Sequence, residues 1–303
     1  MTNLKCFHYL VFAATVVSTL CAETHCPGNV ASLPFRLVNG HQIILLVSVN
    51  HTGPYNFLLD TGTQVTMVDP SIAAQLHLGT NGAAVVAGAG SRESASLAEL
   101  DLVETGAHSV SNLKVLVYDL QRLQPTGLRV EGVLGEDFLE HFDMLIDNAH
   151  RLLCLDDSGA MRTVVKGARI PLLVAADREQ DPALSGLLIV TVRLSDASRP
   201  VRLMLDSGAN APILYNTTQY LSLPPSQTTS LRGRSVDGRQ RLFSALPPQD
   251  MKIGSLAVSG VPFFSLGGVQ QDAGKKGFDG VLTTGLFRRV FIDHADHVAV
   301  LEP

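Results

Sequence analysis

The stretch FLLDTG at residues 57–62 returns as LMLDSG at residues 203–208, and these two copies decide how the chain folds. In each copy an apolar run ends at an aspartate, which is followed by a hydroxyl residue and a glycine. The two aspartates, Asp60 and Asp206, lie 146 residues apart in a chain of 303 residues. The pattern therefore indicates that the chain contains two related halves.

Two further pairs of blocks keep the same order. Gly-Val-Leu stands at 132–134 and again at 280–282, an offset of 148 residues. Ile-Asp-Asn-Ala at 146–149 is echoed by Ile-Asp-His-Ala at 292–295, an offset of 146 residues. Three ordered blocks with near-constant spacing indicate an internal duplication of roughly 130 residues.

The duplication predicts two lobes after a short leader. We expect a signal peptide at 1–22, an N-terminal lobe over 23–160 and a C-terminal lobe over 161–303. The linker between the lobes is expected within 156–185, which contains glycines and a polar stretch.

Short apolar runs with β-branched residues, separated by Gly, Asn, Asp and Pro, predict a chain built mainly of strands. Strands are expected at 43–49, 55–59, 113–118, 151–155, 187–192, 201–205 and 298–301. Asp69 followed by Pro70 predicts the start of a helix, and a second short helix is expected near Glu136. The predicted fold is all-β, with two lobes related by a pseudo-twofold axis.

Composition limits the classes of function. Hydrophobic residues make up 46% of the chain and charged residues 17%, which is enough apolar material for a real core. The net charge is −5, no basic block stands out and Trp is absent, so nucleic acid is a poor partner. No phosphate loop or dinucleotide fingerprint is present.

The N-terminus has the pattern of a secretory signal peptide. Lys5 precedes an apolar run over residues 6–20, and Ala22 offers a small residue for cleavage. The run is short for a membrane span. We expect an extracytoplasmic protein, secreted or periplasmic, and contact with a membrane only if this leader remains as an uncleaved anchor.

Removal of the leader leaves Cys26 and Cys154. An oxidising compartment would permit a bridge between them. The alternative is that Cys154 is a small buried residue and Cys26 is unpaired. The sequence does not separate these two interpretations.

The repeated aspartates carry the chemistry. Each follows an apolar strand, and a carboxylate at the edge of a core is costly unless it is used. The glycine permits the sharp turn that follows, and the Thr or Ser hydroxyl can donate a hydrogen bond that fixes the loop. Two lobes related by a pseudo-twofold axis would place Asp60 and Asp206 across one water, where two like charges share one proton. Such a pair can activate the water for attack on a peptide carbonyl.

With these motifs, the chain resembles the pepsin-like and retropepsin-like aspartic proteases. The resemblance covers most of the chain after the leader. It implies that the residues after each catalytic aspartate interlock across the lobe interface, a role that falls to Thr61 and Ser207. The predicted support of the catalytic loops comes from Thr61, Gly62, Thr63, Ser207 and Gly208.

The resemblance also implies a β-hairpin flap over the cleft from each lobe. In the first lobe the flap would turn at Gly88, Ala89, Gly90 and Ser91. In the second lobe it would include Ser235 and Val236, within the segment 233–238. No tyrosine lies near the first turn, unlike in pepsin-like enzymes, and this favours the retropepsin-like branch. One departure is Thr283, which replaces the glycine present in the first lobe as Gly135.

The two loops differ in one polar residue. Thr63 can donate a hydrogen bond to the Asp60 carboxylate, whereas the side chain of Ala209 cannot do so for Asp206. Hydrogen bonds to the charged form lower a pKa. We therefore expect Asp60 to be ionised more often and Asp206 to hold the proton.

The sequence thus predicts an aspartic endopeptidase that acts on peptides or proteins, with no metal or organic cofactor. One chain supplies both carboxylates, so a monomer is sufficient. The alternatives are a catalytically silent peptide-binding protein on the same fold, and a structural β-domain in which neither aspartate matters beyond its turn.

Two other clusters are assigned to turns. The third Asp-Ser-Gly triplet, 157–159, has flanks that fit no repeat block. The pairs Asp293-His294 and Asp296-His297 could suggest a metal site, but their place in the repeat predicts a solvated turn.

Overall fold

The computed structural model describes residues 25–88, 91–121, 128–174, 186–215, 217, 221, 229–234, 240–266 and 277–303. Strands dominate these residues and helices are few, which confirms the predicted all-β fold. The short helical elements are η1 (Pro27–Asn29), α1 (Pro70–Gln75), α2 (Glu136–Leu139), α3 (Ala160–Val164) and η7 (Thr284–Leu286). No helix in the described part of the chain is long and apolar enough to cross a membrane.

The first sheet is built from strands of the first half of the chain. Among the described residues its order is β2-β3-β4-β9-β5-β8-β7-β6. These strands span Arg36–Val38 (β2), Gln42–Val49 (β3), Thr52–Leu59 (β4), Gly132–Leu134 (β9), Met67–Val68 (β5), His108–Val117 (β8), Ser91–Thr105 (β7) and Ala83–Gly88 (β6).

The second sheet is built from strands of the second half. Over the described ranges its order is β17-β18-β21-β16-β22-β15-β14-β19-β20, and β13 pairs with β14 outside this path. The strands span Thr229–Arg234 (β17), Gln240–Ala245 (β18), Phe264–Leu266 (β21), Ile213–Leu214 (β16), Gly280–Thr283 (β22), Val201–Asp206 (β15), Leu188–Leu194 (β14), Gln249–Ile253 (β19), Leu256–Val261 (β20) and Leu173–Val174 (β13).

Both sheets contain the same central arrangement, as the repeat predicts. β4 runs parallel to β9 in the first sheet, and β15 runs parallel to β22 in the second. β5 is antiparallel to β9 and parallel to β8, and β16 is antiparallel to β22 and parallel to β21. The repeated Asp-Thr/Ser-Gly and Gly-Val-Leu blocks are therefore neighbouring strands in each half.

The apolar runs before the two aspartates are continuous because both faces of these strands are covered. In β4, Phe57 and Leu59 pack into the largest core cluster, whereas Leu58 faces a second cluster. In β15, Leu205 joins the largest cluster and Met204 faces a third. Each aspartate therefore emerges from a strand that is fixed on both sides.

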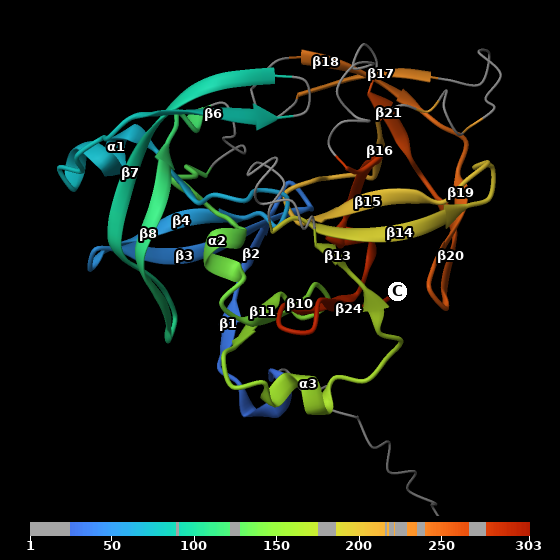
Figure 1. The fold of residues 1–303 in the computed structure, drawn as a ribbon, viewed down its shortest axis with the longest axis horizontal. Helices are drawn as coiled ribbons and strands as arrows, with labels where there is room; N and C mark the ends of the chain where they lie inside the picture. Colours follow the sequence, from blue (N-terminus) through green and yellow to red (C-terminus); the bar gives the residue numbers. More distant parts are fainter. Residues whose placement is uncertain are drawn as a thin grey trace, which may run out of the picture.

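A third sheet joins the two halves. Within the described residues its order is β1-β11-β10-β23-β24-β12, and its central pair β10–β23 takes one strand from each half. The strands span Ser32–Pro34 (β1), Leu152–Asp156 (β11), Asp143–Asp147 (β10), Arg289–Asp293 (β23), Val298–Glu302 (β24) and Ile170–Pro171 (β12). Figure 1 shows the first sheet on the left, the second on the right, and β1, β10, β11 and β24 below them.

The predicted boundary between the lobes, after residue 160, lies inside α3. It stays a prediction, as does the signal peptide. The two predicted helix starts are present: Asp69 caps α1 by accepting a hydrogen bond from Ser71 N at 3.0 Å, and α2 begins at Glu136. The triplet 157–159 lies in a bend before α3, as predicted.

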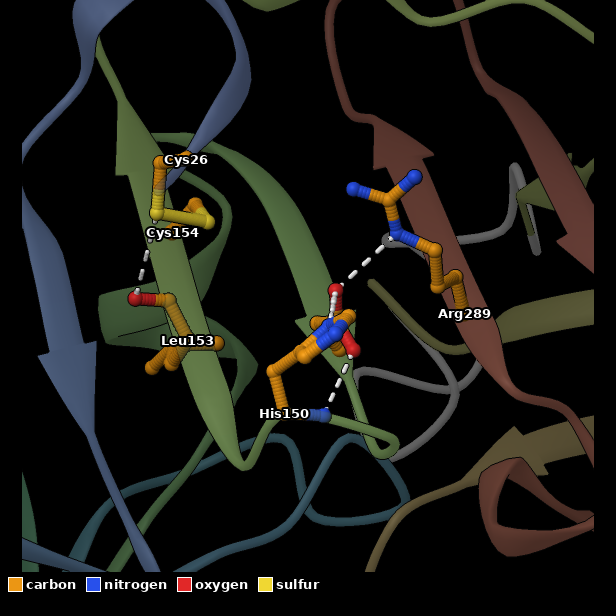
Figure 2. Close-up of a disulfide and its surroundings, with 6 residues drawn as sticks. Cys26, His150, Leu153, Cys154 and Arg289 are labelled. Carbon is orange, nitrogen blue, oxygen red and sulfur yellow. Dashed lines mark hydrogen bonds and ion pairs between the residues drawn. A yellow bond between two sulfur atoms is a disulfide. The ribbon is translucent and has the colours of Figure 1, made fainter. Parts of the chain in front are cut away.

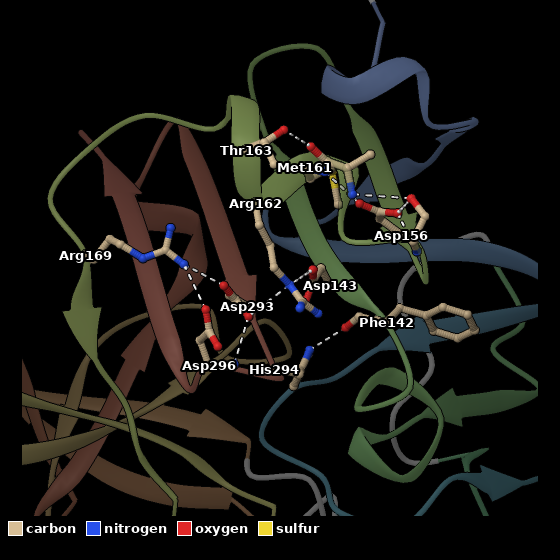
Figure 3. Close-up of polar contacts among 12 residues, drawn as sticks. Phe142, Asp143, Asp156, Met161, Arg162, Thr163, Arg169, Asp293, His294 and Asp296 are labelled. Atoms are coloured by element: carbon tan, nitrogen blue, oxygen red, sulfur yellow. Dashed lines mark hydrogen bonds and ion pairs between the residues drawn. The ribbon is translucent and has the colours of Figure 1, made fainter.

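The two ends of the β10–β23 pair are stabilised in different ways. At one end Asp147 lies opposite Arg289, with Nε 3.1 Å from Oδ2. At the other end the buried Asp143 and Asp293 are bridged by Arg162 of α3, whose Nη2 lies 3.0 Å from Asp143 Oδ1 and whose Nε lies 3.3 Å from Asp293 Oδ1 (Figure 3). Arg169 Nη2 also lies 2.5 Å from Asp293 Oδ2, so the segment that connects the halves supplies two cations that balance the two carboxylates.

The disulfide left open by the sequence is present. Cys26 and Cys154 are bonded, with Cα atoms 5.7 Å apart and a sequence separation of 128 (Figure 2). The bridge fixes the N-terminal segment to β11, and both cysteines are buried against Met161 of α3 and Phe291 of β23.

Because the bridge closes a loop of 128 residues, it restricts the unfolded chain strongly. We expect reduction, or replacement of both cysteines by alanine, to lower the free energy of unfolding by about 2–5 kcal/mol. Denaturant unfolding with and without a thiol reductant measures this loss. The doubly substituted protein is the control, since the reductant should not change it. An oxidised protein that unfolds at the same denaturant concentration as the reduced one contradicts the prediction.

Candidate active site

Asp60 and Asp206 occupy equivalent places at the ends of the two central strands. Asp60 directly follows β4, and its N–H donates to Leu134 O of β9 at 3.1 Å. Asp206 is the last residue of β15 and lies opposite Thr283 of β22. Both residues are only partly exposed.

The loops that follow the aspartates are joined by four crossed hydrogen bonds. Thr61 N donates to Ser207 Oγ at 3.1 Å, and Ser207 N donates to Thr61 Oγ1 at 3.0 Å. The Thr61 hydroxyl donates to Leu205 O at 3.0 Å, and the Ser207 hydroxyl donates to Leu59 O at 2.9 Å. Each hydroxyl thus accepts from the opposite loop and donates to the opposite strand. The structure brings Thr61 and Ser207 together in the interlocking arrangement that the resemblance implies.

Gly62 and Gly208 allow the two loops to approach each other closely. A Cβ atom at Gly62 would lie 2.6 Å from Asp206 Cγ, and one at Gly208 would lie 2.8 Å from Asp60 Cγ. Both distances are shorter than real Cβ contacts. Each glycine therefore faces the carboxyl group of the opposite half, and any side chain there would push the aspartates apart.

The two loops bring the Asp60 and Asp206 carboxyl groups close to each other, and the charge of Asp60 acts on Asp206, so together they behave as one titrating unit. Desolvation raises the pKa of Asp60, although hydrogen bonds from Thr63 and Gly62 oppose the shift. Desolvation and then the Asp60 charge raise the pKa of Asp206 well above its usual range. The pair therefore retains a proton at a pH where an isolated aspartate is ionised, and Asp206 holds it.

The hydrogen bonds explain this difference, and they include the Thr63 donor that the sequence predicts together with a backbone donor that it does not. Asp60 accepts through both oxygens, from Gly62 N to Oδ1 at 2.9 Å and from the Thr63 hydroxyl to Oδ2 at 2.8 Å. Asp206 accepts from Gly208 N at 2.7 Å and from Ala209 N at 2.9 Å, but both bonds reach Oδ1. Ala209 thus contributes through its backbone, and Oδ2 of Asp206 is left to carry the proton.

Thr283 fits the second loop through its hydroxyl group. In the first half, a Cβ at Gly135 would lie 2.9 Å from Val65 C, and Glu136 N donates to Thr63 O at 2.8 Å. In the second half, Thr283 Oγ1 donates to Ala209 O at 2.6 Å. Thr63 O and Ala209 O are equivalent carbonyl oxygens. The first accepts a hydrogen bond from a backbone amide and the second accepts one from the Thr283 hydroxyl, so the carbonyl is satisfied in both halves.

The predicted flaps correspond to two hairpins at the edges of the sheets. β6 pairs with β7 up to Gly88 opposite Ser91, and β17 pairs with β18 up to Arg234 opposite Gln240. Figure 1 shows β6, β17 and β18 along the upper edge of the view. Ala89, Gly90, Ser235 and Val236 lie outside the described residues.

Three residues near the dyad were missed in the sequence. Burial and the Asp206 charge raise the pKa of Tyr215, whose ring packs at a tilt against Phe278 with ring centroids 6.0 Å apart. Glu136 and His294 form a buried pair, so the prediction of a solvated turn at 293–297 was wrong for His294. The sequence feature that could have identified His294 is its alignment with Asn148 in the repeated Ile-Asp blocks.

Within the described ranges, no group of three or more His, Cys, Asp or Glu side chains could hold a metal ion.

Comparison with known proteins agrees with this geometry. Residues 45–138, which carry Asp60 and the Gly-Val-Leu block of the first half, match the aspartyl protease family. A solved structure described as a retropepsin-like aspartic protease from Rickettsia conorii matches with 21% identity and a TM-score of 0.31, over 42% of this chain and 90% of that one. No curated protein matches the chain. The family match over residues 45–138 confirms the predicted resemblance to aspartic proteases.

The crossed hydrogen bonds should be important for stability. Ser207→Ala leaves Thr61 N and Leu59 O buried without their partner, and each unsatisfied group costs about 1–3 kcal/mol. We expect the free energy of unfolding to fall by about 2–5 kcal/mol in denaturant titrations. Ser111→Ala on the exposed side of β8 is the matched control and should change it by less than about 0.5 kcal/mol. Equal effects of the two substitutions would show that these bonds do not stabilise the fold.

Removal of the Thr63 hydroxyl should move one limb of the pH–rate profile. Thr63→Ala deletes a donor to the Asp60 carboxylate, so the pKa of Asp60 rises. Activity is then lost at a higher pH as the solution is acidified. We expect the acid limb of kcat/KM for peptide cleavage to move up by about one pH unit. An unchanged acid limb in a folded Thr63→Ala protein contradicts this assignment.

Proposed function

We propose that this chain is an aspartic endopeptidase, in which a water held between Asp60 and Asp206 attacks a peptide carbonyl. The single observation that carries the proposal is the contact between the two carboxyl groups, which the crossed Thr61–Ser207 hydrogen bonds hold in place. The family match at residues 45–138 supports the same class of hydrolase.

The hydrogen bonds support a different role for each carboxyl group. Asp60, with a donor on each oxygen, is the ionised member and takes a proton from the water as general base. Asp206, which holds the proton, donates it to the carbonyl oxygen as negative charge develops there. One proton enters the pair and one leaves it, so the dyad keeps its net charge through the addition step.

The substrate that best fits this site is an extended peptide. β6 and β17 are edge strands of their sheets, and edge strands can pair with an added strand. The peptide would lie between the dyad and the two hairpins and form strand-like hydrogen bonds. One chain provides both carboxylates, so the proposal does not require a second copy.

We also propose that the protein works outside the cytoplasm. The disulfide between Cys26 and Cys154 supports an oxidising compartment, in agreement with the leader pattern at residues 1–22.

Cleavage of a peptide library by the purified protein, from acid to neutral pH, tests the proposal. We expect the wild type to cleave, and Asp60→Asn and Asp206→Asn each to lower kcat/KM by at least about 10³-fold. Asp157→Asn is the matched control, since Asp157 is an exposed aspartate in the third Asp-Ser-Gly triplet and should leave cleavage unchanged. A folded wild-type protein that binds peptides but cleaves none at any pH would contradict the proposal and favour a peptide-binding protein.

A further inference from the structure

Glu136 and His294 form a buried contact between the two halves of the chain. His294 Nε2 lies 3.1 Å from Glu136 Oε2, and the two side chains are 8% and 1% exposed. His294 Nδ1 lies 2.6 Å from Phe142 O, as Figure 3 shows. A carbonyl oxygen only accepts hydrogen bonds, so Nδ1 must carry a hydrogen.

With Nδ1 protonated, the contact between Nε2 and Oε2 depends on a single proton. When the proton is present, either an imidazolium faces a carboxylate or a neutral imidazole accepts from a carboxylic acid. Both forms attract, and both leave the pair with no net charge. When the proton is lost, the lone pair of Nε2 faces a buried carboxylate and the contact becomes repulsive.

This contact is connected to Asp60 through two hydrogen bonds. Glu136 N donates to Thr63 O at 2.8 Å, and the Thr63 hydroxyl donates to Asp60 Oδ2 at 2.8 Å. The backbone of Glu136 therefore holds the backbone of Thr63, the residue whose hydroxyl favours ionised Asp60.

The other half of the molecule has a counterpart that does not titrate. Asn148 occupies the position equivalent to His294 in the repeat. Its Nδ2 donates to Thr284 O at 3.2 Å and to Phe287 O at 2.9 Å, at the turn that follows β22. In both halves a side chain from the third sheet thus reaches the turn after the Gly-Val-Leu strand of the other half.

We propose that the Glu136–His294 pair is a proton-dependent latch that positions the Asp60 loop through Thr63, and that Asn148 is its pH-independent counterpart. Glu136 and His294 are positioning residues and do not touch substrate. The catalytic part of this inference rests on the proposed function, whereas the latch itself does not.

The surroundings of the pair favour retention of its proton. Burial raises the pKa of Glu136, and the charges of Glu140 and Asp60 act in the same direction. Burial opposes a charge on His294, but the hydrogen bond and charge of Glu136 raise its pKa overall, and Asp143 adds to this. Because the folded-state pKa of His294 is raised, the latch is fully present below pH 6.5, its unfolded value, and is lost as pH rises through the folded-state pKa.

Thermal unfolding between pH 5 and 10 tests the latch without an activity assay. His294→Ala should lower Tm by about 3 °C or more at pH 6, and this difference from wild type should shrink as pH rises. Asn148→Ala is the matched control and should lower Tm by the same amount at every pH. Glu136→Gln should keep the latch and flatten the alkaline decline, because a glutamine amide can donate to Nε2 at any pH.

Two results would overturn the latch. One is a Tm difference between wild type and His294→Ala that stays constant with pH. The other comes from NMR titration of the wild-type protein and does not need a folded variant: a pair that has lost its shared proton at pH 6.5 or below, with a neutral His294 imidazole and an ionised Glu136 carboxylate.

Peptide cleavage tests the connection to Asp60. His294→Ala should move the acid limb of kcat/KM upward, as Thr63→Ala does, and the double variant should show no further shift because both act through one hydrogen bond. Additive shifts would show that the pair does not act through Thr63. If the wild type does not cleave, the proposed function fails, and the unfolding and NMR measurements still decide the latch.

Discussion

The crossed hydrogen bonds between Thr61 and Ser207 are the constraint on which the rest of the site depends. Two carboxyl groups repel each other when both are ionised, so a site that holds them in contact needs an attachment that does not rely on the carboxyls themselves. The two hydroxyl groups provide it, because each accepts from one loop and donates to the backbone of the opposite strand. The glycines at 62 and 208 then leave room for the carboxyl groups to meet.

Duplication accounts for what could be predicted from the sequence. A repeated block with constant spacing identifies equivalent positions, so the residue pattern alone was enough to place Asp60, Asp206 and the strands that carry them. Thr61 and Ser207 are equivalent residues, and the resemblance predicted their contact, but contacts between the halves whose partners are not equivalent could not be placed in this way. The role of His294 depends on Glu136, which lies 158 residues away and outside every repeated block. Residue 209 donates to Asp206 through its backbone amide, and a backbone donor cannot be predicted from the side chain of that residue.

Equivalent positions in the two halves are stabilised by different hydrogen-bond donors and ion-pair partners. One carbonyl of the catalytic loop accepts from a backbone amide in the first half and from the Thr283 hydroxyl in the second. At the two ends of the β10–β23 pair, Asp147 faces an arginine, whereas Asp143 and Asp293 share Arg162. Asp60 and Asp206 differ as well, because Asp60 accepts hydrogen bonds through both of its oxygens, whereas the two backbone donors to Asp206 both reach Oδ1.

The third sheet also affects how the chain is made. β10 is complete when less than half of the protein has been synthesised, but its neighbour β23 lies within the last residues of the chain. Until residues 289–293 arrive, one side of β10 is an open strand edge, and open edges pair readily with other chains. Two nascent molecules at high concentration can therefore exchange second halves through this edge and form a swapped dimer. The pairing of β10 with β23 is thus a late step that leaves one strand edge open until the chain is almost complete.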